Sequence, residues 1–276
     1  MDAIHLHNVS KRYPTFTLGP IDLTVPTGRV VGFIGENGAG KSTTIKLILG
    51  LLMPDSGSVQ VFGEDGCRDL EHVGVVFDSC HFPGDLSARD IGRVLSASFR
   101  TWSDKTFEDY LTRFDLPRKK PVKDYSRGMQ MKLSIACALS HDCRLLLLDE
   151  PTSGLDPVIR DEILDIFYDF MQDDSHSILI SSHITSDLEK ICDYVAFIHQ
   201  GQIALFEEKD SLLARLGILH ADPSVLSSLT PDAILGVRRG QFQTQALVER
   251  DRVPSSLPLD PVKLDDILLF LARKEG

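Results

Sequence analysis

A glycine-rich segment near the start of the chain has the spacing of a phosphate-binding loop. Residues 35–42 read Gly-Glu-Asn-Gly-Ala-Gly-Lys-Ser, which matches the consensus GxxxxGKS/T in full. Glycines let the backbone curl so that successive N–H groups face one anion, and a following helix adds its N-terminal dipole. The Lys41 side chain can extend to the β- and γ-phosphates of a nucleotide, and the Ser42 hydroxyl can ligate Mg²⁺. The residues expected around the phosphates are Gly35, Asn37, Gly38, Ala39, Gly40, Lys41, Ser42 and Thr43.

Two acidic residues close an apolar run later in the chain. Residues 145–148 are four leucines, and Asp149 and Glu150 follow directly. A buried strand that ends in a carboxylate would bring Asp149 to a Mg²⁺ beside the phosphates. Glu150, one residue further on, would be placed to polarise an attacking water as a general base. The two motifs indicate nucleotide binding and hydrolysis, but they do not separate a kinase, a GTPase and a motor ATPase. The NKxD sequence typical of GTPases is absent.

The residues around these motifs predict the elements that position them. Residues 29–34 form a continuous β run, as expected for a strand buried on both faces, and an apolar helix from 43 to about 52 follows. Residues 84 to about 140 favour helices, the first of them opened by a capping box at Ser87. Strands and helices then alternate again, so the predicted fold is α/β with an inserted helical block.

The order of the motifs resembles that of the nucleotide-binding subunits of ATP-binding cassette (ABC) transporters over about residues 3–215. Tyr13 lies where that family places an aromatic ring on adenine, and residues 35–43 match its Walker A loop. Asp149 and Glu150 close the Walker B strand, and His183 matches the switch histidine. The resemblance implies that Glu150, His183 and Lys41 are the catalytic residues, with ATP as ligand and Mg²⁺ as cofactor.

Two further motifs resemble the parts of an ABC subunit that face a partner. Residues 125–129, Tyr-Ser-Arg-Gly-Met, take the place of the LSGGQ signature, and residues 153–156 take the place of the D-loop. The resemblance implies a head-to-tail dimer around two ATP molecules, in which each chain completes the other's site. Asp156 precedes Pro157 and is also expected to cap a helix. The residues assigned to these contacts across the dimer are Ser126, Arg127, Gly128, Met129 and Asp156.

The chain departs from the family pattern at two places. In the signature, Arg127 replaces a glycine and Met129 replaces the glutamine. Arg127 either adds positive charge near the γ-phosphate or is a solvated surface residue, and the sequence favours neither. Asp78 occupies the Q-loop position after Val-Val-Phe, where the family has glutamine. An ionised Asp only accepts hydrogen bonds. It is therefore expected to contact Mg²⁺ or its water, while a contact with the attacking water becomes doubtful.

The resemblance also implies an organisation for the whole chain. It predicts a P-loop NTPase (RecA-like) core with an antiparallel β subdomain and a helical subdomain at about 84–140. Residues 1–216 would form the ABC ATPase domain, and residues 217–276 a small C-terminal accessory region. The short helical block, the relaxed signature and the C-terminal region resemble bacterial exporter-type ATPases that serve separately encoded permeases.

Composition constrains the partners of the chain. The 276 residues contain 40 Asp and Glu against 29 Lys and Arg, a net charge of −11, which argues against an extended nucleic-acid-binding face. No apolar run approaches the roughly 18–20 residues of a membrane helix. We therefore expect an integral membrane permease as a separate partner, a homodimer or heterodimer of ATPase subunits, and a location at the cytoplasmic face of the membrane. The alternative is a soluble ABC ATPase with an assembly or other non-transport role.

Overall fold

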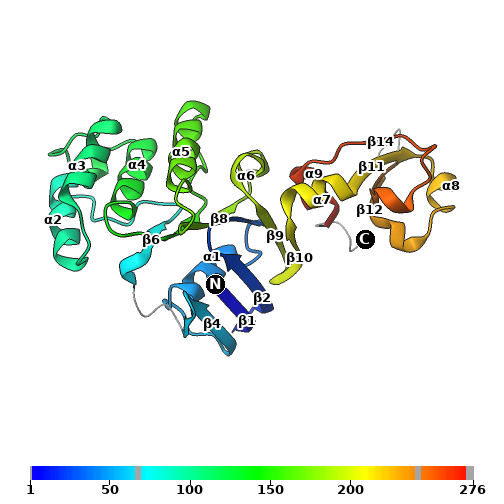
Figure 1. The fold of residues 1–276 in the computed structure, drawn as a ribbon, viewed down its shortest axis with the longest axis horizontal. Coiled ribbons are helices and arrows are strands. Elements are labelled where there is room, and N and C mark those ends of the chain that lie inside the picture. Colours follow the sequence, from blue (N-terminus) through cyan, green and yellow to red (C-terminus); the bar gives the residue numbers. More distant parts are fainter. Residues whose placement is uncertain (1, 66–69, 240–243, 272–276) are drawn as a thin grey trace.

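The computed structural model describes residues 2–65, 70–239 and 244–271. Its centre is a six-stranded sheet in the order β10-β9-β3-β8-β7-β6 (Figure 1). The strands pair in parallel except β10, which is antiparallel to β9. Every residue of β3, β7 and β8 is buried, which explains why apolar residues run without alternation through β3, through residues 145–148 of β7 and through residues 178–180 of β8. The bounds are β3 Val30–Ile34, β6 Val73–Val76, β7 Leu145–Asp149, β8 Ser177–Ser182, β9 Tyr194–His199 and β10 Gln202–Glu208.

Three helices follow strands of this sheet and begin close to the predicted site. They are α1 Lys41–Ile48 after β3, α5 Pro157–Phe170 after β7, and α6 Thr185–Ile191 after β8. The expectation that the first helix runs to about residue 52 is wrong at its C-terminal end. Gly50 has a φ of 67°, and this left-handed conformation ends the helix before the apolar pattern ends.

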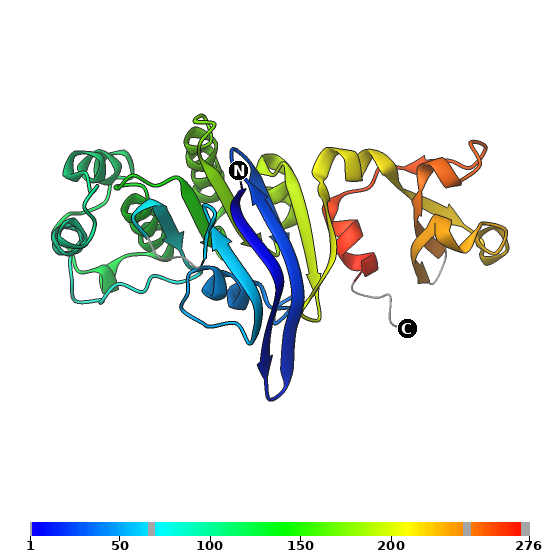
Figure 2. The same ribbon diagram turned by 60° about the horizontal axis from the view of Figure 1, so that its bottom comes forward.

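A second, antiparallel sheet packs beside the first and carries the long hairpin seen in Figure 2. Its order is β2-β1-β4-β5, with the bounds β1 Asp2–Tyr13, β2 Phe16–Pro26, β4 Ser56–Val61 and β5 Glu64–Asp65. Buried residues of β1, β2, β3 and α1 form one continuous apolar cluster. The hairpin thereby places Tyr13, at the end of β1, next to the loop that follows β3.

Helices occupy one end of the molecule (Figure 1). They are α2 Ala88–Ser98, α3 Asp104–Arg113 and α4 Arg127–Ala138, with short 3₁₀ turns at Leu70–His72 and Val122–Asp124. The capping box predicted at Ser87 is confirmed, because the Ser87 side chain accepts from Asp90 N and the Asp90 carboxylate accepts from Ser87 N. Glu71 links this block to the core: its carboxylate accepts from Thr101 N and Thr101 Oγ1, both at 2.6 Å.

A third sheet, in the order β12-β13-β11-β14, lies at the opposite end (Figures 1 and 2). Arg215 joins it to the central sheet through Glu207 and Glu249, at 2.7 Å each. The predicted helix at 264–271 is confirmed as α9, while residues 240–243 of the predicted strand 240–248 lie outside the described residues. The elements are α7 Lys209–Arg215, β11 Leu216–Ala221, α8 Pro223–Leu226, a 3₁₀ turn Pro231–Ala233, β12 Ile234–Arg239, β13 Thr244–Glu249, a 3₁₀ turn Arg250–Arg252, β14 Leu259–Asp260 and α9 Leu264–Leu271. Within the described ranges, no helix has the length and apolarity to cross a membrane.

Candidate nucleotide-binding and hydrolysis site

The loop between β3 and α1 needs glycine where the sequence has it. Gly40 precedes α1 with a φ of 116°, and a Cβ there would lie 2.4 Å from Leu18 Cδ1. A Cβ on Gly35 would lie 2.5 Å from the Ile198 carbonyl oxygen. Gly38 also has a positive φ, 83°, but faces open space. The loop is therefore pressed against the protein at both ends and open in the middle, where a ligand can approach the backbone.

Lys41 lies under this loop and is 6% exposed. Its Nζ donates to the Gly35 carbonyl at 2.7 Å and to the Glu36 carbonyl at 3.3 Å. The same ammonium group lies 3.3 Å from Glu150 Oε1. The loop thus folds around the Lys41 side chain, and the ammonium group lies next to Glu150 at the end of β7.

The two acids at the end of β7 are held by one serine on the neighbouring strand. Asp149 is 4% exposed and pairs in register with Ser181 of β8, whose Oγ donates to Asp149 Oδ1 at 2.5 Å. The Glu150 N–H donates back to Ser181 O at 3.0 Å and to Ser181 Oγ at 3.2 Å. Glu150 itself has a φ of 53°, a conformation that costs a non-glycine residue about 1–3 kcal/mol. Ser181 therefore fixes one carboxylate and supports the strained backbone of the other.

Glu150 lies between the two other predicted catalytic residues. His183 Nδ1 is 2.6 Å from Glu150 Oε2, and the His183 N–H donates to the same oxygen at 3.3 Å. Lys41 faces the other oxygen, Oε1, at ion-pair distance. Oε1 is buried and has no hydrogen-bond partner in the described part of the chain. The carboxylate thus has Oε2 hydrogen-bonded to His183, while Oε1 is paired only with the charge of Lys41 and keeps its capacity to accept a hydrogen bond.

A cavity of about 600 Å³ opens over these groups. It is bounded by the β1–β2 hairpin, the loop before α1, Asp78 and the end of β7. Tyr13 stacks on Phe16 at its mouth, with ring centroids 6.4 Å apart. Its lining consists of Tyr13, Pro14, Thr15, Phe16, Glu36, Asn37, Gly38, Gly40, Lys41, Ser42, Thr43, Asp78, Asp149 and Glu150.

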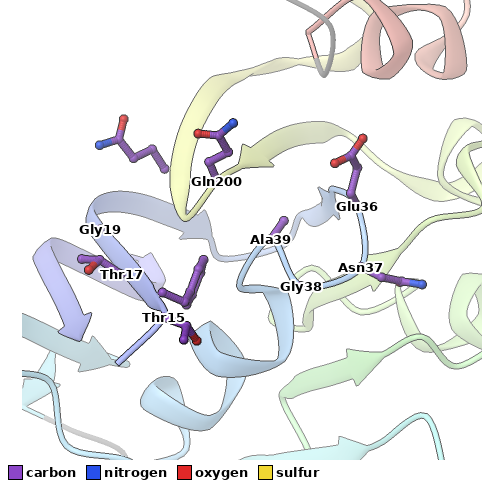
Figure 3. A pocket seen from close by; sticks show the side chains of 10 residues that line it. Thr15, Thr17, Gly19, Glu36, Asn37, Gly38, Ala39 and Gln200 are labelled. Atoms are coloured by element: carbon purple, nitrogen blue, oxygen red, sulfur yellow. The ribbon is translucent and has the colours of Figure 1, made fainter. Parts of the chain in front are cut away.

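A second hollow of about 510 Å³ adjoins the cavity on the hairpin side. Figure 3 shows Gly38 and Ala39 of the loop facing Thr15 and Thr17 of the hairpin, with Gln200 across the opening. Together the two hollows extend from the phosphate loop along the aromatic residues of the hairpin. Their shape suits a ligand with a polyanionic end and a flat ring.

The signature and D-loop residues lie apart from this cavity. Ser126 caps α4, since its Oγ accepts from Met129 N at 3.3 Å, and neither it nor Arg127, Gly128 or Met129 lines the cavity. Arg127 lies over Gly154 of the D-loop, with its Cζ 3.0 Å from where a Gly154 Cβ would be. The predicted cap at Asp156 is confirmed, because its Oδ1 accepts from Val158 N and Ile159 N at 3.1 Å each.

Comparison with known proteins identifies the family. The sequence matches the family described as ABC transporter over residues 18–153. It is 37% identical over 211 residues to the lantibiotic transport ATP-binding protein SrtF of Streptococcus pyogenes, covering 75% of this chain and 91% of that protein. The chain belongs to the ABC transporter ATP-binding family. The bacitracin transport ATP-binding protein BcrA of Bacillus licheniformis is 35% identical over 191 residues, 66% of this chain and 62% of that one.

Solved structures agree with the ABC assignment. A structure described as the ATP-binding subunit of an ABC transporter superposes with a TM-score of 0.69 at 26% identity, covering 77% of this chain and 92% of that chain. A post-hydrolysis dimer of the cassette MJ0796, bound to ADP and phosphate, superposes with a TM-score of 0.66 at 20% identity, covering 74% and 98%. The likeness at 20% identity shows the shared P-loop NTPase fold.

The site of this ABC ATPase also fits Mg²⁺. Hydroxyl and carboxylate oxygens are the ligands that Mg²⁺ prefers, and it is usually held by one or two carboxylates together with the phosphates of its substrate. Ser42, Asp78 and Asp149 all line the cavity and supply that donor set. Asp149 Oδ1 is already bonded to Ser181, an arrangement that orients a ligating carboxylate.

Ser181 is a residue of this site that sequence reasoning missed. Its hydrogen bonds join positions 32 residues apart, which no local spacing reveals. The available signal was two serines directly after the apolar residues 178–180, because a polar side chain in a wholly buried strand requires a partner.

Proposed function

We propose that this ABC ATPase powers export through a separate membrane permease, as one half of an ATP-bridged dimer at the cytoplasmic face of the membrane. The names of its relatives support transport of bacitracin and lantibiotics, and another relative is the Nod factor export ATP-binding protein I of Sinorhizobium fredii, at 34% identity. The observation that carries ATP hydrolysis as the source of power is the position of Glu150 between Lys41 and His183, over a cavity lined by the phosphate loop.

The geometry assigns a task to each of these side chains in hydrolysis. Lys41 leaves the Gly35 carbonyl and bonds the β- and γ-phosphates of ATP, since an anion is a stronger acceptor than a neutral carbonyl. Oε1 of Glu150, released from Lys41 by that movement, then orients a water and accepts its proton as the water oxygen attacks the γ-phosphorus. The bond between the γ-phosphorus and the oxygen that bridges it to the β-phosphate breaks, and ADP and phosphate leave. His183 holds the other oxygen of Glu150 and keeps the carboxylate aimed at the water.

Mg²⁺, held by Ser42, Asp78 and Asp149, would supply charge neutralisation between the β- and γ-phosphates. Asp78 shares the cavity with three other acids, Glu36, Asp149 and Glu150, and their mutual repulsion makes a cation favourable there. Asp78 would therefore hold the metal in this chain, at the position where the family has glutamine. Tyr13 offers an exposed ring for adenine.

A second ABC subunit, identical or related, completes the site. Ser126, Gly128 and Met129 lie at the N-terminus of α4, away from their own cavity, where backbone N–H groups and the helix dipole suit a phosphate. Arg127 adds an exposed cation at the same place. Asp156 belongs to the same partner-facing surface. ATP thereby joins the two subunits, and loss of the γ-phosphate opens the dimer.

We further propose that residues 1–216 form the ATPase domain and 217–276 an accessory region. The extent of the lantibiotic relative, which matches 211 residues of this chain, supports this division. The helical subdomain at 84–140 and the loop that carries Asp78 would form the groove for the permease. This places the surface that receives the permease next to a metal ligand.

Co-purification from detergent-solubilised membranes tests the transport role. We expect a tagged chain to retain an integral membrane protein and its ATPase rate to rise in that complex. The Lys41→Ala chain is the control, because it should bind the same membrane protein without hydrolysing ATP. Isolation of only soluble partners would contradict the transport role and favour an assembly function.

A further inference from the structure

A buried carboxylate outside the nucleotide cavity lies against residues on both sides of the D-loop. Asp187, in α6, is 2% exposed. Its Oδ2 accepts a hydrogen bond of 2.7 Å from Thr152 Oγ1, just before the D-loop at residues 153–156. Arg160 Nε lies 3.8 Å from the same oxygen. Arg160 is one turn beyond the D-loop, since its N–H donates to the Asp156 carbonyl at 3.0 Å.

The backbone of Asp187 belongs to the segment that follows the switch histidine. Helix α6 begins at Thr185, two residues after His183. The Asp187 N–H donates to the Ile184 carbonyl at 3.2 Å and closes the first turn of that helix. His183 bonds Glu150, and Thr152 lies two residues after Glu150. Asp187 therefore connects the helix that follows His183 to Thr152, which lies between Glu150 and the D-loop.

The two contacts of Asp187 differ in strength. Thr152 is fully buried, and its hydroxyl forms a short, charge-assisted hydrogen bond. Arg160 Nε is buried without any hydrogen-bond partner among the described residues, although Asp187 is within ion-pair distance. A buried donor without a partner is costly. A movement of α5 by about 1 Å would bring Nε to normal hydrogen-bond distance. The hydrogen bond to Thr152 thus fixes the segment before the D-loop. Arg160, after the D-loop, can still move closer to Asp187.

We propose that Asp187 is a positioning residue that couples the His183 segment to the D-loop, so that the state of one ATP site reaches the partner subunit. The inference rests on the proposed ATP-bridged dimer. Asp187 contacts no substrate in this scheme. It holds Thr152, and through it the backbone after Glu150, while Arg160 closes on it when the D-loop engages the partner.

Steady-state ATPase kinetics of four variants test the proposal. We expect Asp187→Ala to lower kcat about 10- to 100-fold, the loss that follows from a small misplacement of catalytic groups. The KM for ATP should stay near that of the wild type because the phosphate loop is untouched, and the Hill coefficient for ATP should fall towards 1. Thr152→Val keeps the size of the side chain and removes only the donor, so it should shift kcat and the Hill coefficient in the same direction. Asp187→Asn keeps an acceptor for Thr152 and should restore part of kcat.

The matched control is Asp161→Asn. It breaks the exposed ion pair of Lys190 Nζ with Asp161 Oδ1, 2.6 Å, which joins the same two helices, α5 and α6, at the surface. This variant should keep wild-type kinetics.

Thermal melts of each variant separate positioning from stability, with activity measured well below the midpoint. A lower melting temperature with unchanged kcat and Hill coefficient in Thr152→Val and Asp187→Ala would overturn the proposal, as would a change in KM alone. If Asp187→Ala does not fold, Thr152→Val decides the question. An inactive wild type that fails to dimerise with ATP would instead contradict the proposed function itself.

Discussion

Replacing Ser181 by alanine removes the hydroxyl that connects both acids of the site. Ser181 is fully buried, donates to Asp149 and accepts from the Glu150 N–H. The change deletes one oxygen atom, so any cavity it leaves is small, and the lost hydrogen bonds dominate the effect. Glu150 N keeps its bond to the Ser181 carbonyl. The main loss is therefore the charge-assisted bond to Asp149.

The size of the effect follows from that bond. A hydrogen bond to a charged group contributes about 1.5–3 kcal/mol, so we expect Ser181→Ala to lower the free energy of unfolding by about 2 kcal/mol. For a chain of this size this corresponds to a melting temperature lower by about 4–8 °C. If the same energy is lost in the transition state, kcat/KM falls by up to about 30-fold.

Ser140→Ala is the matched control, measured by calorimetry and by ATPase assay. Ser140 is buried to a similar degree, and its Oγ donates to the neutral Ala136 carbonyl at 2.6 Å, outside the nucleotide cavity. Ser140→Ala should lower the free energy of unfolding by about 1 kcal/mol and leave kcat/KM unchanged. Equal stability losses in both variants, with wild-type kinetics in Ser181→Ala, would refute the role assigned to Ser181.

Three further predictions concern other parts of the chain. Lys41→Ala should weaken ATP binding about 10- to 150-fold in calorimetry, because it removes a charged donor to the phosphates, and unchanged affinity would contradict the phosphate-loop assignment. Asp78→Gln should raise the Mg²⁺ concentration for half-maximal ATPase activity about three- to tenfold, because it removes a carboxylate ligand, and identical Mg²⁺ curves would show that the substitution is neutral. Hydrogen bonds from the side chain and backbone of Thr101 lower the pKa of Glu71 from its usual 4.5 to about 2. This stabilisation is present above pH 4.5 and is lost as the pH falls towards 2, so the difference in melting temperature between wild type and Glu71→Gln should shrink over that range. A difference in melting temperature that stays constant from pH 4.5 to pH 2 would contradict the stabilising role of the Glu71 carboxylate.

Local spacing predicted the parts of the site that depend on consecutive residues. The phosphate loop, the acids after β7 and the caps at Ser87 and Asp156 each need only a few neighbouring positions. The antiparallel strand β10 was not predicted, because its alternating exposure gives a weaker signal than the buried strands. The extent of α1 was overestimated, since the left-handed Gly50 outweighs the apolar residues after it.

Contacts between distant segments could not be predicted from spacing. Ser181 with Asp149, and Asp187 with Thr152, each join segments more than 30 residues apart. Arg127 illustrates the limit: the sequence favoured neither of its two roles. The structure places its guanidinium over Gly154, so close that a side chain on residue 154 would clash with it. Within the described ranges it forms no ion pair.

The central claim is that Glu150 activates the attacking water in a site shared by two subunits. Glu150→Gln removes the proton acceptor but keeps the shape of the side chain, so ATP binding should persist while hydrolysis stops. Size-exclusion chromatography with light scattering, in the presence of ATP and Mg²⁺, measures the outcome directly. We predict a stable dimer for Glu150→Gln and a monomer without nucleotide. A Glu150→Gln chain that remains monomeric with ATP and hydrolyses it at the wild-type rate would contradict the account.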